Sequence, residues 1–253
     1  MPRYFLARHS YACETGGFGV FLDLKHDKYT AVSPEDLRTL RMSVEGWTAA
    51  PALANQAVAS PGATQLVEQR EPHDAPSEDE DVIATLLKEG LLTADTVSGK
   101  PATPPMLETP TASLWEFPRP WPQLGRRELR NFVSAWLATT LRLRALPISH
   151  VINRWRNGEI YKRRQSAPFD INKARALTTI HFTLQPAFYS AADACLRNSL
   201  TLLEFLARYD VYPTCVFGVK MDPFAAHAWV QRGPVVLTDP ISHVKTFTPI
   251  MLV

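Results

Sequence analysis

The first part of the chain alternates between short apolar runs and turn-forming residues. Residues 19–24 (GVFLDL) and 29–32 (YTAV) are β-prone and are separated by the polar segment 25–28. Two such runs joined by turn residues predict a hairpin. Ser33 and Pro34 come next, and a serine cap followed by proline at the first helical position predicts a helix start.

A second short helix is predicted further along. The acidic run 78–81 would place favourable negative charge at the start of a helix over 82–89, which Gly90 would end. The intervening residues 42–75 show no regular pattern. A hairpin with short helices offers too small a core for an enzyme on its own, so this part predicts a binding module.

The remainder of the chain is first helical and then mixed. Helical spacing covers residues 123–146 and stops at Pro147, and the pattern after Pro168 becomes helix, strand, strand. Residues 180–182 alternate as a strand would. Strand-like runs at 226–231 and 235–239 are joined by residues 232–234, which predicts a second hairpin.

Proline usage divides the two parts. The 253 residues include 21 prolines but only 11 glycines. Seven of the prolines fall between Pro101 and Pro122, where they favour an extended, semi-rigid spacer. The sequence therefore predicts an α+β protein with a domain at 1–97, a linker at 98–122 and a second domain at 123–253.

Charge and cysteine usage narrow the setting. The net charge is only +2, and no apolar run reaches the length of a membrane span. Ten arginines and one lysine lie between Arg119 and Arg164, which we interpret as a solvated face or a docking surface for an acidic partner, not as a nucleic-acid site. Three scattered cysteines and the lack of an apolar signal core indicate a reducing, cytoplasmic protein without disulfides.

Cys195 is the first candidate for chemistry. Ser190 and Asp193 have the spacing of a capping box, and leucines follow at helical intervals. Cys195 would therefore lie in the first two turns of an amphipathic helix, where the helix N-terminus favours a thiolate. The alternative is a small buried hydrophobic residue, which is what most lone cysteines are.

His227 and Asp239 supply the groups that a nucleophilic thiol needs. A three-residue loop over 232–234 would place these two residues directly opposite each other on neighbouring strands, with Cβ atoms about 5 Å apart. Cys, His and Asp can then act as nucleophile, base and orienter in acyl chemistry. The backbone N–H of Cys195 and the side chain of Gln185 are candidate oxyanion donors. The alternative is a structural His–Asp pair.

These residues resemble a known family. Cys195-Leu196, then residues 227–230 (HAWV) and 238–240 (TDP), resemble the transglutaminase-like, papain-like cysteine peptidases, and more narrowly the B proteins of bacterial lasso peptide biosynthesis. The resemblance covers residues 123–253. It implies that Cys195, His227 and Asp239 are a catalytic triad that hydrolyses the bond between the leader and core segments of a ribosomally made precursor.

The resemblance also implies a role for residues 1–97. In some of these systems a small winged-helix-like leader-recognition element precedes the peptidase, and the precursor's leader would add a strand at the edge of its sheet. Phe21, Tyr29 and Leu37 are candidate leader contacts, although apolar residues at periodic positions are more often core. The implied partner is an ATP-dependent macrolactam synthetase, similar to asparagine synthetase, that closes the ring.

Other readings stay open at this point. The same triad could transfer an acyl group to an amine, or the chain could be a non-catalytic adaptor that presents the leader to the cyclase. His181 is the rival catalytic base, Cys215 is expected to be buried, and Cys13 is expected to be exposed. The sequence contains no phosphate loop, dinucleotide fingerprint or metal-binding helix motif, so no cofactor and no metal are expected.

Overall fold

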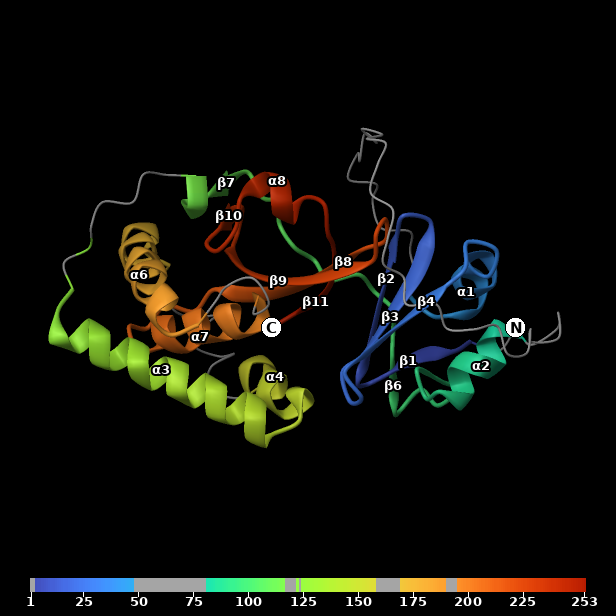
Figure 1. Cartoon of the computed structure of the whole chain (residues 1–253). Helices are drawn as coiled ribbons and strands as arrows, with labels where there is room; N and C mark the ends of the chain where they lie inside the picture. Colours follow the sequence, from blue (N-terminus) through green and yellow to red (C-terminus); the bar gives the residue numbers. More distant parts are fainter. Residues whose placement is uncertain (1–2, 48–80, 117–121, 123, 158–168, 190–194) are drawn as a thin grey trace.

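The chain is a mixed helix and sheet protein, as expected from the sequence. The computed structural model describes residues 3–47, 81–116, 122, 124–157, 169–189 and 195–253. Three sheets and their helices form two parts that lie against each other, the N-terminal part on the right and the C-terminal part on the left in Figure 1. The predicted irregular segment 42–75 falls mostly outside the described residues.

Two small antiparallel sheets and two helices form the N-terminal part. One sheet has the order β2-β3-β4 and the other the order β5-β1-β6. The elements are β1 (Phe5–Ala7), β2 (Ser10–Thr15), β3 (Phe18–Asp23), β4 (Lys28–Val32), α1 (Leu37–Ser43), α2 (Val82–Lys88), β5 (Leu92–Thr93) and β6 (Gly99–Lys100).

The predicted hairpin is confirmed, since β3 pairs with β4 in the register Asp23 to Lys28. The second helix is also confirmed: the Asp81 side chain accepts a hydrogen bond from the backbone N–H of Ile83 at 3.0 Å, and Gly90 has a φ of +72°. The first helix begins at Leu37, later than predicted. The Ser33 side chain instead bonds Asp36 and stabilises the turn before the helix.

Strands β2, β3 and β4 are covered on both faces. Residues of one face, including Val20 and Leu22, pack in the same core cluster as the helices and strands of the C-terminal part. The intervening Phe21 points the other way, into a core with α1 and α2. Because side chains alternate along a strand, the apolar run in β3 serves two cores at once.

A five-stranded sheet is the centre of the C-terminal part. Its order is β11-β8-β9-β10-β7, and α7 packs on β9 with α3 and α6 beyond it (Figure 1). The elements are β7 (Ala112–Ser113), α3 (Arg126–Ala145), α4 (Ile148–Arg156), α6 (Ile171–Leu184), α7 (Cys195–Ala207), β8 (Thr214–Lys220), β9 (Ala225–Arg232), β10 (Val235–Val236), α8 (Ile241–Val244) and β11 (Thr248–Leu252), with short 3-10 turns η1 (Leu114–Glu116) and η2 (Gln185–Ala187).

The predicted linker contributes a strand to one sheet of the N-terminal part and a strand to the sheet of the C-terminal part. Strand β6 pairs with β1 in the N-terminal part, and β7 pairs in parallel with β10 in the C-terminal part. The Thr111 N–H also donates to the Pro234 carbonyl at 2.9 Å. The described residues of this proline-rich segment therefore contribute one two-residue edge strand to each of these two sheets.

Two helix predictions in the C-terminal part are confirmed and one strand prediction is wrong. The amphipathic helix expected to carry Cys195 in its first two turns is α7. The helix expected over 123–146 is α3. The strand expected over 180–182 is wrong, because these residues lie inside α6, which Asp170 caps through the N–H groups of Asn172 and Lys173. An alternation of only three residues is compatible with both the strand period of two and the helical period of 3.6. The Asp170 cap favours the helix.

Part of the arginine cluster has an acidic partner within the chain. Glu204 of α7 is buried with its side chain 9% exposed and forms ion pairs with Arg142, Arg154 and Arg208. A buried carboxylate needs such compensation. Other arginines of α3, such as Arg126 and Arg130, are exposed. The acidic docking partner anticipated from sequence is thus, for Arg142 and Arg154, internal.

None of the helices in the described ranges combines the length and apolar character that crossing a bilayer requires.

The position of Phe21 in the N-terminal core can be tested by truncation. Phe21 is fully buried and its ring lies 5.4 Å from that of Trp47. We expect Phe21→Ala to lower the free energy of unfolding by about 3–5 kcal/mol, measured by urea denaturation. Met42→Ala is the matched control, since Met42 is 65% exposed and its loss should cost below about 0.5 kcal/mol. Equal effects of the two changes would contradict the assignment.

Candidate active site

Cys195 is the first residue of α7. The helix buries Leu200, Leu203 and Leu206 against the sheet, which orients its N-terminus toward β9. Cys195 is a free thiol of intermediate exposure. The predicted capping residues Ser190 and Asp193 lie outside the described residues, so the capping box stays a prediction.

His227 lies near the start of β9, where it pairs with Gly218 of β8. A Cβ at Gly218 would lie 2.6 Å from the Trp229 ring, so this position requires glycine. The indole of Trp229 stacks on the imidazole of His227 with centroids 6.2 Å apart and an interplanar angle of 16°. The buried indole therefore shields one face of the imidazole.

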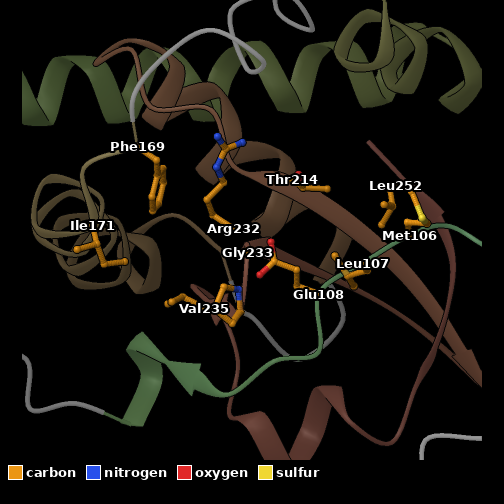
Figure 2. A pocket seen from close by; sticks show the side chains of 11 residues that line it. Met106, Leu107, Glu108, Phe169, Ile171, Thr214, Arg232, Gly233, Val235 and Leu252 are labelled. Carbon is orange, nitrogen blue, oxygen red and sulfur yellow. The ribbon is translucent and has the colours of Figure 1, made fainter.

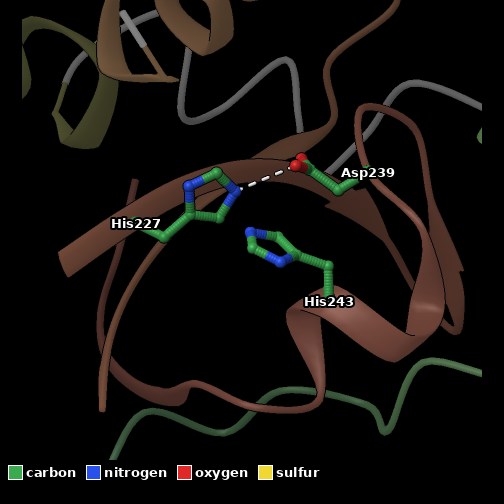
Figure 3. A group of neighbouring side chains, drawn as sticks. All are labelled: His227, Asp239 and His243. Atoms are coloured by element: carbon green, nitrogen blue, oxygen red, sulfur yellow. Dashed lines mark hydrogen bonds and ion pairs between the residues drawn. The ribbon is translucent and has the colours of Figure 1, made fainter. Parts of the chain in front are cut away.

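Asp239 holds the imidazole from the other side. Nε2 of His227 and Oδ1 of Asp239 are 2.9 Å apart, as Figure 3 shows. The Thr238 hydroxyl donates to Oδ2 of Asp239 and accepts from the Val230 N–H at 3.0 Å. The carboxylate is thereby anchored to the backbone of β9, the same strand that carries the histidine.

The pairing arises by a different route from the one predicted. Val235 pairs with Arg232 and Val236 with Gln231, so the turn contains two residues, Gly233 and Pro234, and the register is one residue off. Gly233 adopts a φ of +53°, which permits the tighter turn. Strand β10 ends at Val236, and the chain then leaves the ladder and brings Asp239 to His227 through the Thr238 contact.

The thiol and the imidazole complete the chain of contacts. The Cys195 side chain is hydrogen-bonded to His227, whose Nε2 is taken by Asp239, so Nδ1 faces the sulfur. The hydrogen bond from His227 lowers the pKa of the thiol more than burial raises it, and the N–H groups of Ala228 and Leu196 add to the lowering. The pair therefore favours a thiolate beside an imidazolium.

His227 shows the complementary shift. Burial lowers the pKa of the imidazole, but the hydrogen bonds to Asp239 and Cys195 outweigh it and raise the pKa to about 9. A neutral imidazole with such support can accept the thiol proton, and the imidazolium that results can release it to a leaving group.

A buried serine fixes the helix against the strand. The Ser199 hydroxyl, one turn after Cys195 on α7, donates to the Ala228 carbonyl at 3.0 Å, next to His227 on β9. Ser199 is 1% exposed. The sequence analysis does not name Ser199, and it names Thr238 only as part of the motif 238–240. The available signal for Ser199 was a hydroxyl at a core position four residues after Cys195.

Two other candidate residues, His181 and Gln185, have different outcomes. His181 is fully buried in α6, where its Nε2 lies 2.9 Å from the Asn198 side-chain oxygen. Burial lowers its pKa to about 4, which suits a structural histidine better than a base. Gln185 starts η2 and is 5% exposed; its role as an oxyanion donor stays a prediction.

The other cysteines are buried. Cys215 is fully buried in β8, as expected, whereas Cys13, expected to be exposed, is 4% exposed in β2. Burial raises the pKa of the Cys13 thiol to about 12. Cys13 alternates onto the face of the N-terminal sheet that packs on the C-terminal part, which accounts for the difference.

The three candidate leader contacts are divided by the sheet. Phe21 is fully buried and Leu37 is 3% exposed, both in the core with α1 and α2, so a core role accounts for them. Tyr29 of β4 faces the C-terminal part, where its ring lies 5.7 Å from that of Phe224. Burial raises the pKa of Tyr29 to about 12, with the charges of Asp27 and Cys195 adding to the effect, so the phenol is within electrostatic reach of the thiol.

A surface cavity lies at the far end of β9. It measures about 650 Å³ and has apolar walls from Leu107, Phe169, Ile171 and Val235, with Arg232 and Glu108 as charged groups, as Figure 2 shows. Arg232 is five residues along the strand from His227, roughly 17 Å at 3.3–3.4 Å per residue. The cavity is thus separate from the thiol.

The thiol–imidazole contact predicts a pH profile. Because the pKa of Cys195 is lowered from 9.0, alkylation by iodoacetamide should have its midpoint below pH 9 in the unmodified protein. His227→Gln removes the stabilising partner, so the midpoint should rise and the rate at pH 7 should fall at least about tenfold. Mass spectrometry of the Cys195 peptide measures both.

His150→Gln is the matched control, since His150 is exposed on α4. It should leave the alkylation profile unchanged. A midpoint that stays at the same pH in His227→Gln would contradict the contact.

Comparison with known proteins agrees with this geometry. Residues 136–252 match the family described as the transglutaminase-like superfamily, and the match includes Cys195, His227 and Asp239. Searches of curated proteins and of solved structures give no significant match. Residues 136–252 of this chain are therefore a transglutaminase-like superfamily domain.

Proposed function

We propose that this protein is a cytoplasmic cysteine peptidase of bacterial lasso peptide biosynthesis, which binds a ribosomally made precursor and hydrolyses its leader–core peptide bond. The observation that carries the proposal is the hydrogen-bonded series Cys195, His227, Asp239 within a transglutaminase-like domain. That superfamily includes cysteine peptidases and acyltransferases, and both begin with attack by a thiolate.

The proposed reaction uses the triad in two half-reactions. The Cys195 thiolate attacks the scissile carbonyl carbon, and the oxyanion that forms is stabilised by backbone N–H donors such as that of Cys195. The His227 imidazolium gives its proton to the leaving amine, and the C–N bond breaks to leave a thioester. The neutral imidazole then takes a proton from water, hydroxide attacks the thioester, and the thiol leaves with that proton.

Asp239 and Thr238 would keep the base in position through both steps. The carboxylate accepts from Nε2 of His227, which leaves Nδ1 for the sulfur. The Thr238 hydroxyl restrains the second carboxylate oxygen. Such restraint lowers the cost of orienting the imidazole at the moment of reaction.

The arrangement of the N-terminal part supports a substrate-binding role for it. Strand β4 is an edge of its sheet among the described residues, and Tyr29 on that strand packs against Phe224 near Cys195. A leader segment added along β4 would place the following residues of the precursor beside the thiol. We propose that the N-terminal part is the leader-recognition element, with a winged-helix-like fold, and that the released core passes to an ATP-dependent macrolactam synthetase.

The central test is loss of the nucleophile. The substrate would be a lasso precursor, whose gene we expect as a short open reading frame beside an asparagine-synthetase-like gene near the gene of this protein. We expect Cys195→Ala to reduce cleavage to background while precursor binding stays within about twofold, because the thiol does the chemistry and not the binding. Cys13→Ala is the control and should cleave normally. Cleavage by Cys195→Ala at the unmodified rate would contradict the proposal.

The mass of the product distinguishes two alternatives of different class. A free leader acid shows hydrolysis, whereas a new amide shows acyl transfer to an amine. Two results together would favour a non-catalytic adaptor that presents the leader to the cyclase. The precursor would bind but stay intact, and an electrophile would label Cys195 no faster than the buried Cys13.

Tyr29 provides a test of the leader path. We expect Tyr29→Ala to lower kcat/KM for the precursor about tenfold, which corresponds to about 1.4 kcal/mol, because it removes the aromatic wall next to Cys195. Thr30→Ala is the matched control on the opposite face of β4, and its kcat/KM should stay within about twofold of the unmodified protein. Equal kcat/KM values for the two variants would contradict the path.

A further inference from the structure

His243 lies beside the triad without a part in it. It is on the short helix α8, directly after the segment that carries Asp239, and its ring centroid is 4.8 Å from that of His227 at an angle of 81°. Figure 3 shows the two imidazoles and the carboxylate converging. The thiol, base and orienter are complete without His243, so the proposed chemistry does not explain why a second histidine is there.

The three side chains offer a set of metal-ligand atoms. One nitrogen each from His227 and His243 and one oxygen from Asp239 all lie within 4.8 Å of one another. Zinc bonds of about 2.0–2.1 Å in tetrahedral geometry separate ligand atoms by about 3.4 Å. Nε2 of His227 and Oδ1 of Asp239, at 2.9 Å, are already close to that separation. The side chain of His243 is exposed, so it has room to adjust toward the other two ligands.

The surroundings of the set suit a bound cation. The Thr238 hydroxyl orients the carboxylate, and the thiol of Cys195 occupies the second nitrogen of His227. Hydrogen-bonded partners of this kind fix ligands for a metal.

We propose that His227, Asp239 and His243 form a zinc-binding site next to the thiol. The ion would bind Nε2 of His227, Oδ1 of Asp239 and His243, with solvent in the fourth position. Zn²⁺ displaces the Nε2 proton to solvent, and Nδ1–H stays on the sulfur. With zinc on Nε2 the ring cannot become an imidazolium, so its Nδ1–H is a weaker acid toward a leaving amine, and the carboxylate that orients the ring is held by the metal.

The ligand types select the metal. Two imidazoles and one carboxylate suit Zn²⁺ and related transition metals, whereas Mg²⁺ prefers oxygen ligands and keeps its waters. The site lies at the exposed edge of α8, so an ion can reach it from solvent without unfolding of the core.

The test measures binding directly, with no peptide substrate, so its failure is distinguishable from failure of the proposed peptidase function. The full chain is titrated with ZnCl₂ and separately with MgCl₂ by isothermal titration calorimetry. We expect one equivalent of Zn²⁺ and no measurable Mg²⁺. His243→Phe keeps an aromatic ring against Phe247 and should weaken zinc binding at least about tenfold. His150→Gln, which removes an exposed histidine of α4, should bind as the unmodified protein does.

Two further variants keep the result interpretable. His243→Gln should weaken binding as His243→Phe does, with the thermal midpoint of each variant showing that it is folded. Cys195→Ala should retain zinc, because the sulfur is not in the ligand set. The site is disproved by any of three results: no zinc uptake by the unmodified protein, normal uptake by both folded His243 variants, or loss of uptake in Cys195→Ala.

Discussion

Strand β9 is fixed from both sides, and the relative positions of Cys195, His227 and Asp239 depend on that. The Ser199 hydroxyl of α7 bonds the Ala228 carbonyl, and the Thr238 hydroxyl accepts from the Val230 N–H. The helix that begins with the thiol and the loop that ends with the carboxylate are thus both attached to the strand that carries the base. Both are buried hydrogen bonds between a short hydroxyl side chain and the backbone, and such bonds are electrostatically stronger in the interior than in water.

The same strand explains which parts of the site the sequence could predict. The sequence predicts the pairing of His227 with Asp239. It does so, however, from a hairpin register in which both strands stay paired as far as these two residues. Gly233 and Pro234 form a tighter turn, and β10 ends after Val236. A ladder one residue out of register would have pointed Asp239 away; the bond forms because the chain leaves the ladder and Thr238 redirects it. Turn length and early strand ends depend on tertiary contacts that a local pattern does not contain.

Predictions of secondary structure succeeded where two signals coincided. Helix α2 has an Asp cap, helical spacing and a terminal glycine, and the hairpin of β3 and β4 has two β-prone runs with a polar turn. His181 was misplaced because three residues of alternation are compatible with either period. The sequence alone does not show that Phe21 is a core residue whereas Tyr29 packs on Phe224. That distinction depends on which face of the sheet each residue occupies and on what covers that face.

The sharing of β3 between two cores has a consequence for how this protein can be divided. Cutting the chain after the N-terminal part would leave Val20 and Leu22 without the cover that the C-terminal part provides. A cut at the predicted domain boundary after residue 97 would also separate β1 from its edge partner β6 (Gly99–Lys100). The newly exposed apolar face would favour aggregation. A version of this system that works as two separate polypeptides would need polar residues at these alternate positions, so their hydrophobicity is a sequence marker that the two halves are obligately joined.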